Sequence, residues 1–422
     1  MHQIPEKKSV RIDSIDVLRG FTLLGIILVH FTEQYYAGMH PQKHASFTEK
    51  GIVDNIVSGF TGIFITGKFF MIFSFLFGLS FYLQLSKSNS GPAFFLRFVW
   101  RLAILFAIGF IHSLHYRGDI LTIYAVLGFG LLVSYRLPDK ALLVIALLLT
   151  LNLPSVVNRG INAIQHTEVT SGPGPTAQQT KEDKAAETYY ETVKSGSYLQ
   201  IIDANAHELK GKIDFQFLSG RIYITLGLFL LGLYAGRKKI FENIEFYGPF
   251  LKKLIRYSLW SLLGCIVLTV TFFGTFQSLG IRLPESIQWM AGGLAYDVFN
   301  AAMASIYSAG ILLLFLKEKW RARLLHLYPV GRMGLTTYLM QSIFGFFIFF
   351  SVGFAQLGEI GSTACFGLGL LLFLLQILFS KWWLRYFRFG IFEWLWRTLT
   401  YWKIQPLKRK LEPGFVISPV DT

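Results

Sequence analysis

Long apolar runs constrain this chain more than any other feature of its sequence. A hydrocarbon layer about 30 Å thick is crossed by about 20 residues of α-helix, because a helix rises about 1.5 Å per residue. Ten segments reach or approach that length. They are residues 15–34, 66–86, 94–115, 119–135, 138–156, 216–236, 255–277, 290–316, 333–355 and 362–384. The sequence therefore predicts an all-α polytopic membrane protein of about ten transmembrane helices.

The composition agrees with lipid as the surrounding solvent. Only 15% of the 422 residues are charged, compared with roughly 25% in an average soluble domain. The formal net charge is +15, but the basic residues cluster between apolar runs, as anionic lipid headgroups favour. We therefore expect the lipid bilayer, and no nucleic acid, as a partner. The two cysteines, Cys265 and Cys365, give no Cys/His metal spacing, so no metal is expected.

The Lys and Arg residues predict how the chain crosses the membrane. With the N-terminus in the cytoplasm, the short cytoplasmic segments hold 27 of them and the short opposite segments hold 5. Because positive charge gathers on the cytoplasmic side, both termini are expected there. The expected organisation is five spans in residues 1–156, a helical extracytoplasmic loop in 157–214, five spans in 215–388, and a cytoplasmic interfacial helix and tail in 389–422.

Charged groups inside a bilayer are costly and therefore mark candidate sites. Arg19 and His30 in the first predicted helix are eleven positions apart, about three turns, so they share a face about 16 Å apart along the axis. We expect them to border one conduit, with Arg19 binding a phosphate-bearing donor and His30 acting as a general base. The alternatives are a structural ion pair between Asp16 and Arg19, and a hydrogen bond from His30 to a nearby carbonyl.

A second candidate site lies between the third and fourth predicted helices. His112 is followed after a short turn by Asp119, and a carboxylate there would orient the imidazole and raise its basicity. Asp119 would equally serve as the N-cap of the fourth helix, and the two roles are compatible. We therefore treat both residues as catalytic candidates.

Later apolar runs hold three further candidates. Arg332 precedes the ninth predicted helix and is a second candidate for binding the donor, while Gln341 in that helix and Asp297 in the eighth are candidates for binding the substrate. The competing interpretation is structural, because polar side chains on transmembrane helices usually join neighbouring helices by hydrogen bonds.

Five motifs are spread along nearly the whole chain. They are DVLRGFTLLG at 16–25, KFFMIFSFLFG at 68–78, the GFIH and GDIL elements within 101–128, GRMGLTTYLMQS at 331–342, and EWLWR within 383–400. In this order they resemble the YeiB-like bacterial membrane proteins, which carry domain of unknown function 418 (DUF418). The resemblance implies a multi-pass protein of the bacterial inner (cytoplasmic) membrane.

That family is similar to the transmembrane acyltransferases, including heparan glucosaminide N-acetyltransferase and bacterial sugar O-acyltransferases. The resemblance implies acyl-CoA or acetyl-CoA as co-substrate and a glycan or small envelope acceptor as partner. Arg19 and His30 match the arginine and histidine of the O-acyltransferases' first helix. KHASF at 43–47 resembles the stretch with the heparan enzyme's active-site histidine, which makes His44 a candidate, against the alternative of a solvated loop histidine.

The leading hypothesis is therefore an acyltransferase that moves an acyl group from cytoplasmic acyl-CoA to an extracytoplasmic sugar or envelope acceptor. The main alternative is a transporter or exporter of a small solute without acyl chemistry. Paired broken helices would favour it, and the sequence shows no convincing pair. A membrane scaffold that binds partners through its aromatic C-terminal helix is a third interpretation, and a homodimer is compatible with each.

Overall fold

The computed structural model describes residues 12–38, 40–44, 48–87, 91–165, 177–280 and 285–409. In these ranges the chain is helical, apart from turns, loops and one isolated antiparallel bridge between Phe387 and Lys408. Six helical stretches are long and apolar enough to cross a membrane, or eight when each of two bent helix pairs is counted as one span. The chain is therefore a multi-pass membrane protein, with six to eight spans by this criterion where the sequence predicted about ten.

Each of the ten expected segments overlaps an apolar helix. These helices are α1 (Asp13–Thr32), α3 (Phe69–Leu85), α4 (Pro92–His115), α5 (Leu121–Ser134), α6 (Asp139–Thr150), α11 (Arg221–Arg237), α12 (Ile244–Ser278), α13 (Glu285–Phe315), α16 (Gly334–Phe349) and α17 (Ser362–Tyr386). The difference in number arises because α5 and α16 are shorter than a full span, while α6 and α11 reach that length only with the bent helices α7 (Leu153–Gln165) and α10 (Leu209–Leu218).

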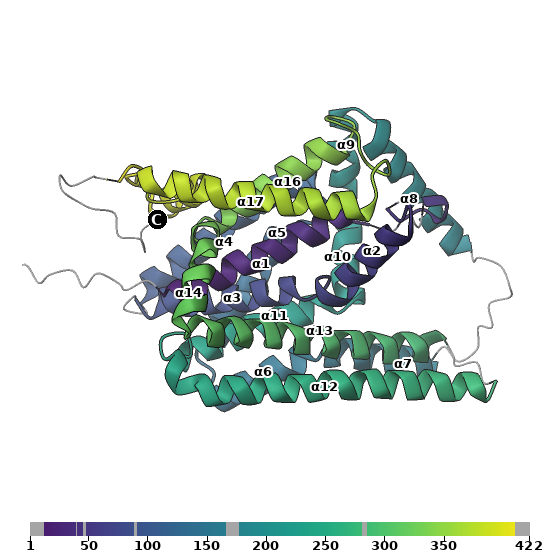
Figure 1. The fold of residues 1–422 in the computed structure, drawn as a ribbon, viewed down its shortest axis with the longest axis horizontal. Coiled ribbons are helices and arrows are strands. Elements are labelled where there is room, and N and C mark those ends of the chain that lie inside the picture. Colours follow the sequence, from purple (N-terminus) through teal and green to yellow (C-terminus); the bar gives the residue numbers. More distant parts are fainter. Residues whose placement is uncertain are drawn as a thin grey trace, which may run out of the picture.

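The remaining helices lie mainly toward the two ends of the bundle. They are η1 (Gln42–His44), α2 (Ile52–Phe64), α8 (Ala177–Ser195), α9 (Tyr198–His207), α14 (Glu318–Leu324), η2 (Leu325–Leu327), α15 (Tyr328–Arg332) and α18 (Ile391–Tyr401). In Figure 1 the yellow C-terminal segment and the start of α1 lie at one end, whereas α8 and α9 lie at the other.

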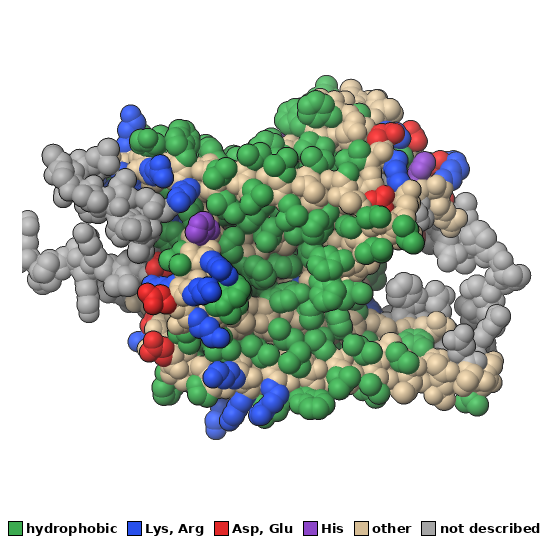
Figure 2. All heavy atoms as spheres, in the orientation of Figure 1, with side chains coloured by type: hydrophobic (Ala, Val, Ile, Leu, Met, Phe, Trp, Pro, Cys, Tyr) green, Lys and Arg blue, Asp and Glu red, His purple; other side chains and the backbone are tan. Residues whose placement is uncertain are grey.

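Charge separates the same two ends. Figure 2 shows an apolar middle and a column of Lys and Arg side chains at the end where α1 begins. Lys252, Lys253 and Arg256 of α12 and Arg321 and Arg323 of α14 are exposed basic residues in this part of the chain. A basic end next to an apolar belt is the distribution that the positive-inside rule describes. We call this end the basic end.

The apolar helix α2 was not foreseen from the sequence. It joins α3 through a break at residues 65–68, and the Lys68 ammonium fills that break. The Lys68 Nζ donates hydrogen bonds to the carbonyl oxygens of Gly62 at 2.9 Å and Thr66 at 2.8 Å. These contacts satisfy carbonyl groups that a helix end leaves without helical partners.

Glycines allow the backbone of α1 to approach η2 and α15 closely. A Cβ atom added to Gly331 would overlap the carbonyl oxygen of Asp16, and one added to Gly20 would overlap the carbonyl oxygen of Leu327. This close packing holds Asp16 and Arg19 next to the segment that carries Arg332.

Gly331→Ala should therefore lower the free energy of unfolding by about 1–3 kcal/mol, because the added methyl group meets backbone that cannot move aside freely. Gly334→Ala is the matched control, since the nearest atom to its added Cβ is the Leu23 Cδ1 at 4.0 Å. Thermal unfolding of the two variants in the same detergent measures the difference. Equal transition temperatures would contradict the close packing of α1 on α15.

Candidate functional site

A histidine and a carboxylate are paired at the turn between α4 and α5. The Nδ1 of His112 lies 2.8 Å from the Oδ1 of Asp119, and both residues are buried. Asp119 also accepts hydrogen bonds from the backbone N–H groups of Leu121 and Thr122, both at 3.0 Å. It is therefore a cap of α5 and the partner of His112 at once. Because a carboxylate accepts, the Nδ1 carries a proton, and in the neutral imidazole the lone pair is then on the Nε2 of His112.

Lys212 of α10 is a third member of this group, and sequence reasoning missed it. Its Nζ lies 3.2 Å from the Oδ2 of Asp119 and 3.1 Å from the Oγ1 of Thr122. A cation at this position favours the ionised form of the Asp119 carboxyl. The pair of charges is separated by 93 positions in the chain, so no local motif could have indicated it.

Aromatic rings join His30 of α1 to the His112–Asp119 pair. The ring centroid of Tyr116 lies 5.2 Å from that of His30 and 5.9 Å from that of His112. A second ring, that of Tyr338, has its centroid 5.3 Å from that of His112. The Nδ1 of His30 and the Nε2 of His112 are buried and have no hydrogen-bond partner among the described residues. Buried polar atoms are usually hydrogen-bonded, so each of these two nitrogens requires an explanation, such as a bound water molecule, a ligand or a catalytic role.

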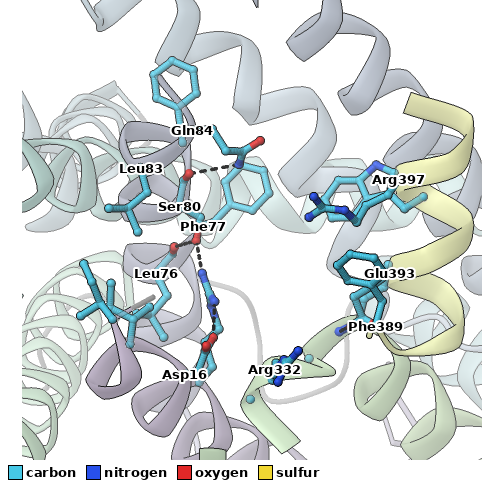
Figure 3. Close-up of a pocket in the computed structure, with 18 of the residues that line it drawn as sticks. Asp16, Leu76, Phe77, Ser80, Leu83, Gln84, Arg332, Phe389, Glu393 and Arg397 are labelled. Carbon is cyan, nitrogen blue, oxygen red and sulfur yellow. Dashed lines mark hydrogen bonds and ion pairs between the residues drawn. The ribbon is translucent and has the colours of Figure 1, made fainter. Parts of the chain in front are cut away.

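A large cavity, which we call the inner cavity, opens near the basic end and has a volume of about 2370 Å³. Eleven Lys and Arg residues line it, compared with four Asp and Glu residues. Arg19 and Arg332, the two predicted donor-binding residues, are both among them. In Figure 3, Asp16 and Ser80 lie on one side of this cavity, Glu393 and Arg397 lie on the other, and Arg332 lies between.

Arg19 combines the two roles that the sequence left open. Its Nη1 lies 2.7 Å from the Oδ1 of Asp16, and its Nη2 donates to the Oγ of Ser80 at 2.5 Å. Its side chain is 25% exposed, whereas that of Asp16 is 2% exposed. The ion pair therefore fixes the guanidinium in place while leaving part of it accessible from the inner cavity.

The C-terminal helix α18 forms a wall of the inner cavity. Glu393 turns its carboxylate to the N-terminus of α16, where Oε1 accepts from the backbone N–H groups of Leu335 at 2.6 Å and Thr336 at 3.1 Å. Burial raises the pKa of the Glu393 carboxyl, and these hydrogen bonds act in the opposite direction. The indole of Trp396 donates to the carbonyl oxygen of Arg101 at 3.0 Å. Glu393 and Trp396 thus attach α18 to α16 and α4.

A second cavity, which we call the outer cavity, has a volume of about 1470 Å³ and lies toward the other end. Its lining includes His30, Glu33, Tyr116, Arg221 and Asp297. Asp297 is anchored there because its Oδ2 accepts from the Nδ2 of Asn152 at 2.9 Å. The predicted substrate-binding carboxylate therefore borders a cavity together with the predicted base His30.

The single conduit expected along α1 corresponds to two cavities in the structure. Arg19 lines the inner one and His30 lines the outer one. His112 lies between them, because its neighbour Tyr338 lines the inner cavity and its neighbour Tyr116 lines the outer cavity. The reason is the aromatic cluster, which fills the space that a tunnel along α1 would need.

Two predicted site residues lie elsewhere. The Nε2 of Gln341 donates to the carbonyl oxygen of Leu23 at 3.3 Å and to the Oε1 of Gln376 at 3.0 Å, so Gln341 joins α16 to α1 and α17. His44 stacks on the ring of Tyr190 with a centroid distance of 4.3 Å. Neither residue is in the lining of the inner or outer cavity. We therefore leave both out of the candidate site, and Ala45 to Phe47 of the KHASF stretch lie outside the described residues.

The fold and site define a helical multi-pass membrane protein with a buried histidine–carboxylate pair. A family model described as a protein of unknown function (DUF418) matches residues 235–403. The uncharacterized protein YxaH of Bacillus subtilis (strain 168) is 30% identical, with 96% of this chain and 98% of the relative covered. The chain therefore belongs to the DUF418 family.

Two further relatives are also similar along most of their length. An uncharacterized 39.9 kDa protein encoded in the amylase 3′ region of Bacillus acidopullulyticus is 28% identical, with 95% of this chain and 97% of the relative covered. The uncharacterized protein YeiB of Escherichia coli (strain K12) is 27% identical, with 92% and 95% covered. No solved structure matches this chain.

Proposed function

We propose that the protein is an acyltransferase of the bacterial cytoplasmic membrane. It moves an acyl group from cytoplasmic acyl-CoA to a hydroxyl or amine on an extracytoplasmic sugar or envelope acceptor. One observation carries the proposal: the Nε2 of His112, a free lone pair on an imidazole oriented by Asp119, lies between residues that line two cavities. His112 itself lines neither cavity, so a reactant from either side would reach the Nε2 only when the neighbouring ring, Tyr338 on the inner side or Tyr116 on the outer side, moves aside.

The inner cavity has the chemistry of the donor site. Coenzyme A carries several phosphate charges, and guanidinium groups bind phosphate oxygens through paired, charge-assisted hydrogen bonds. Arg19 and Arg332 supply such groups, and the excess of basic residues around them attracts anions. Positive charge at this end also supports its assignment to the cytoplasm.

The reaction begins when the Nε2 of His112 takes a proton from the acceptor hydroxyl or amine. The acceptor oxygen or nitrogen then bonds to the thioester carbonyl carbon, and the carbon–sulfur bond breaks. The proton on His112 passes to the leaving thiolate, which departs as the free thiol of coenzyme A. Asp119 stabilises the imidazolium between these two transfers, and Lys212 helps to keep Asp119 ionised.

This mechanism gives the base to His112, whereas the sequence favoured His30. His112 has a carboxylate on its second ring nitrogen, which fixes the tautomer. His30 lines the outer cavity next to Tyr116, a position suited to contacting the acceptor.

The direct test uses purified protein with radiolabelled acetyl-CoA and a panel of alkyl glycosides and amino sugars. Release of the free thiol together with label on an acceptor is the expected result. Absence of both with every acceptor, in protein that still binds coenzyme A, would contradict the proposal.

A transporter is the second candidate, and one observation favours it. The pairs α6–α7 and α10–α11 are bent by 52° and 70°, and broken helices are typical of transporter binding sites. The bends are joined by a hydrogen bond from the Nδ2 of Asn152 to the carbonyl oxygen of Ser219 at 3.2 Å. This candidate predicts that an unmodified solute crosses proteoliposome membranes without acyl-CoA.

A further inference from the structure

We propose that the acceptor is an amphiphile that enters the outer cavity sideways from the bilayer, between α2 and α13. Its polar head would lie near Glu33, Arg221 and Asp297, and its apolar tail would leave between the two helices. That this ligand is the acceptor of the acyl group rests on the proposed function, whereas the binding site itself follows from the geometry of the outer cavity.

Helix α2 is held by contacts near both of its ends. Near its start, the Oδ1 of Asp54 accepts from the backbone N–H of Thr363 at 2.8 Å, and the hydroxyls of Ser58 and Ser362 lie 2.7 Å apart. These contacts attach α2 to the N-terminus of α17. At the other end, the hydroxyl of Tyr307 in α13 donates to the carbonyl oxygen of Phe64 at 2.9 Å. The helix is therefore fixed to α17 along one side and to α13 near its last residue.

The surface beside the end of α2 is apolar. Ile63 of α2 is 52% exposed and Tyr296 of α13 is 51% exposed, whereas Phe60 lies toward α17, with its ring centroid 6.2 Å from that of Phe366. Figure 1 shows that α2 ends next to α13 and diverges from it toward the start of α2, and Figure 2 shows the surface indented at this end of the molecule, away from the basic end. Exposed apolar side chains on both sides of an indentation suit an apolar chain from the surrounding lipid.

The indentation adjoins the outer cavity. Residues 65–67, which follow α2 directly, line the cavity, as do Tyr296 and Asn300 of α13. Tyr296 thus borders both the indentation outside and the cavity inside, and Ile63 is two positions from the first of the lining residues 65–67. An acyl or alkyl chain lying against Ile63 and Tyr296 would lead into the cavity without crossing the aqueous surface.

Two kinds of side chain line the outer cavity. Glu33, Arg221 and Asp297 offer acceptors and a donor for a polar head, and His30 contacts Tyr116, which in turn contacts His112. Phe69, Phe273 and Phe276 supply apolar wall. Polar groups of both signs beside aromatic rings suit a neutral sugar head, since hydroxyls donate to carboxylates and accept from guanidinium. A tail and a sugar head together define a glycolipid-like amphiphile.

A photoreactive alkyl β-glucoside with a diazirine in its chain tests the site in protein reconstituted into nanodiscs. Labelled residues are mapped by mass spectrometry, and labelling of the exposed face of α12 at residues 257–270 serves as the internal reference for probe in the bilayer. We expect labelling within residues 63–71 and 292–300 above that reference. Gly292→Trp should reduce it at least tenfold, because Gly292 lines the outer cavity one helical turn from Tyr296 and the added indole would occupy that part of the cavity.

Gly310→Trp is the matched control on the same helix. No atom lies within 4 Å of an added Cβ at either glycine, and Gly310 is not in the cavity lining. The control should therefore keep the labelling of the native protein. Equal labelling of the two variants, or no labelling above the α12 reference, would overturn the lateral site.

A second arm separates this inference from the proposed function. Acetyl-CoA is supplied with either octyl glucoside or glucose, and acylated product is measured. Product from octyl glucoside that Gly292→Trp abolishes supports both proposals. Labelling that is sensitive to Gly292→Trp without product from either sugar keeps the amphiphile site and removes the acyltransferase. Equal product from glucose and octyl glucoside overturns the requirement for an apolar tail.

Discussion

Replacing His112 with glutamine should lower the rate of acyl transfer by about 100- to 10,000-fold, the range typical of a lost general base. Glutamine fills a similar space and can still donate to Asp119, so the fold should persist. It has no lone pair of comparable basicity at the position of the Nε2. The measurement is the initial rate of thiol release at saturating acetyl-CoA, with thermal unfolding of the same preparation as the check on folding.

His44→Gln is the control for this experiment, because it makes the same chemical change in the loop where His44 stacks on Tyr190. It should keep the native rate. A full rate in His112→Gln would show that His112 is not the general base. A large loss in His44→Gln with a full rate in His112→Gln would instead place the chemistry at the segment that holds His44.

The double variant Arg19→Gln, Arg332→Gln should weaken binding of acyl-CoA by at least about 100-fold. Each lost charge-assisted contact to a phosphate is worth roughly 1.5–3 kcal/mol, and 1.4 kcal/mol corresponds to a tenfold change in affinity. Glutamine at position 19 can still donate to Asp16, which avoids leaving that buried carboxylate without a donor. Calorimetric titration with acetyl-CoA in detergent measures the dissociation constant.

Lys253→Gln, Arg256→Gln is the control matched for the loss of two charges, since both are exposed residues of α12 and neither is in the lining of the inner cavity. It should change the dissociation constant by less than about twofold, an effect typical of a screened surface charge. If the control and the Arg19→Gln, Arg332→Gln variant weaken binding equally, the inner cavity is not the donor site and only general positive charge matters.

Much of the helical framework followed from the sequence because hydrophobicity is a local property. Each of the ten apolar segments overlaps a helix, including the short helix α5. Helix α2 was missed because it has only 13 residues, too few for a span by itself. The bends next to Asn152 and Gly220 were missed because they depend on contacts with distant segments as well as on local conformation, which is left-handed at Gly220 with φ of 73°.

The candidate site was predictable only in part. His112 and Asp119 are close in sequence, so their pairing had a local signal, and Arg19 and Arg332 were recognised as charges within or beside apolar runs. The partners that complete the site come from far away in the chain: Lys212 reaches Asp119 from α10, and Tyr338 reaches His112 from α16. Sequence spacing could not indicate these contacts, and for the same reason it suggested one tunnel where the packed rings give two cavities.

The most direct test of the account is the sidedness of the reaction in sealed proteoliposomes that contain the protein in one known orientation. Labelled acetyl-CoA is placed on the side of the basic end and octyl glucoside on the other. The account predicts acylated glucoside, with the free thiol of coenzyme A remaining on the donor side. Product that forms only when both reactants share one side, or unmodified glucoside that crosses without acetyl-CoA faster than in protein-free liposomes, would contradict a base positioned between two cavities.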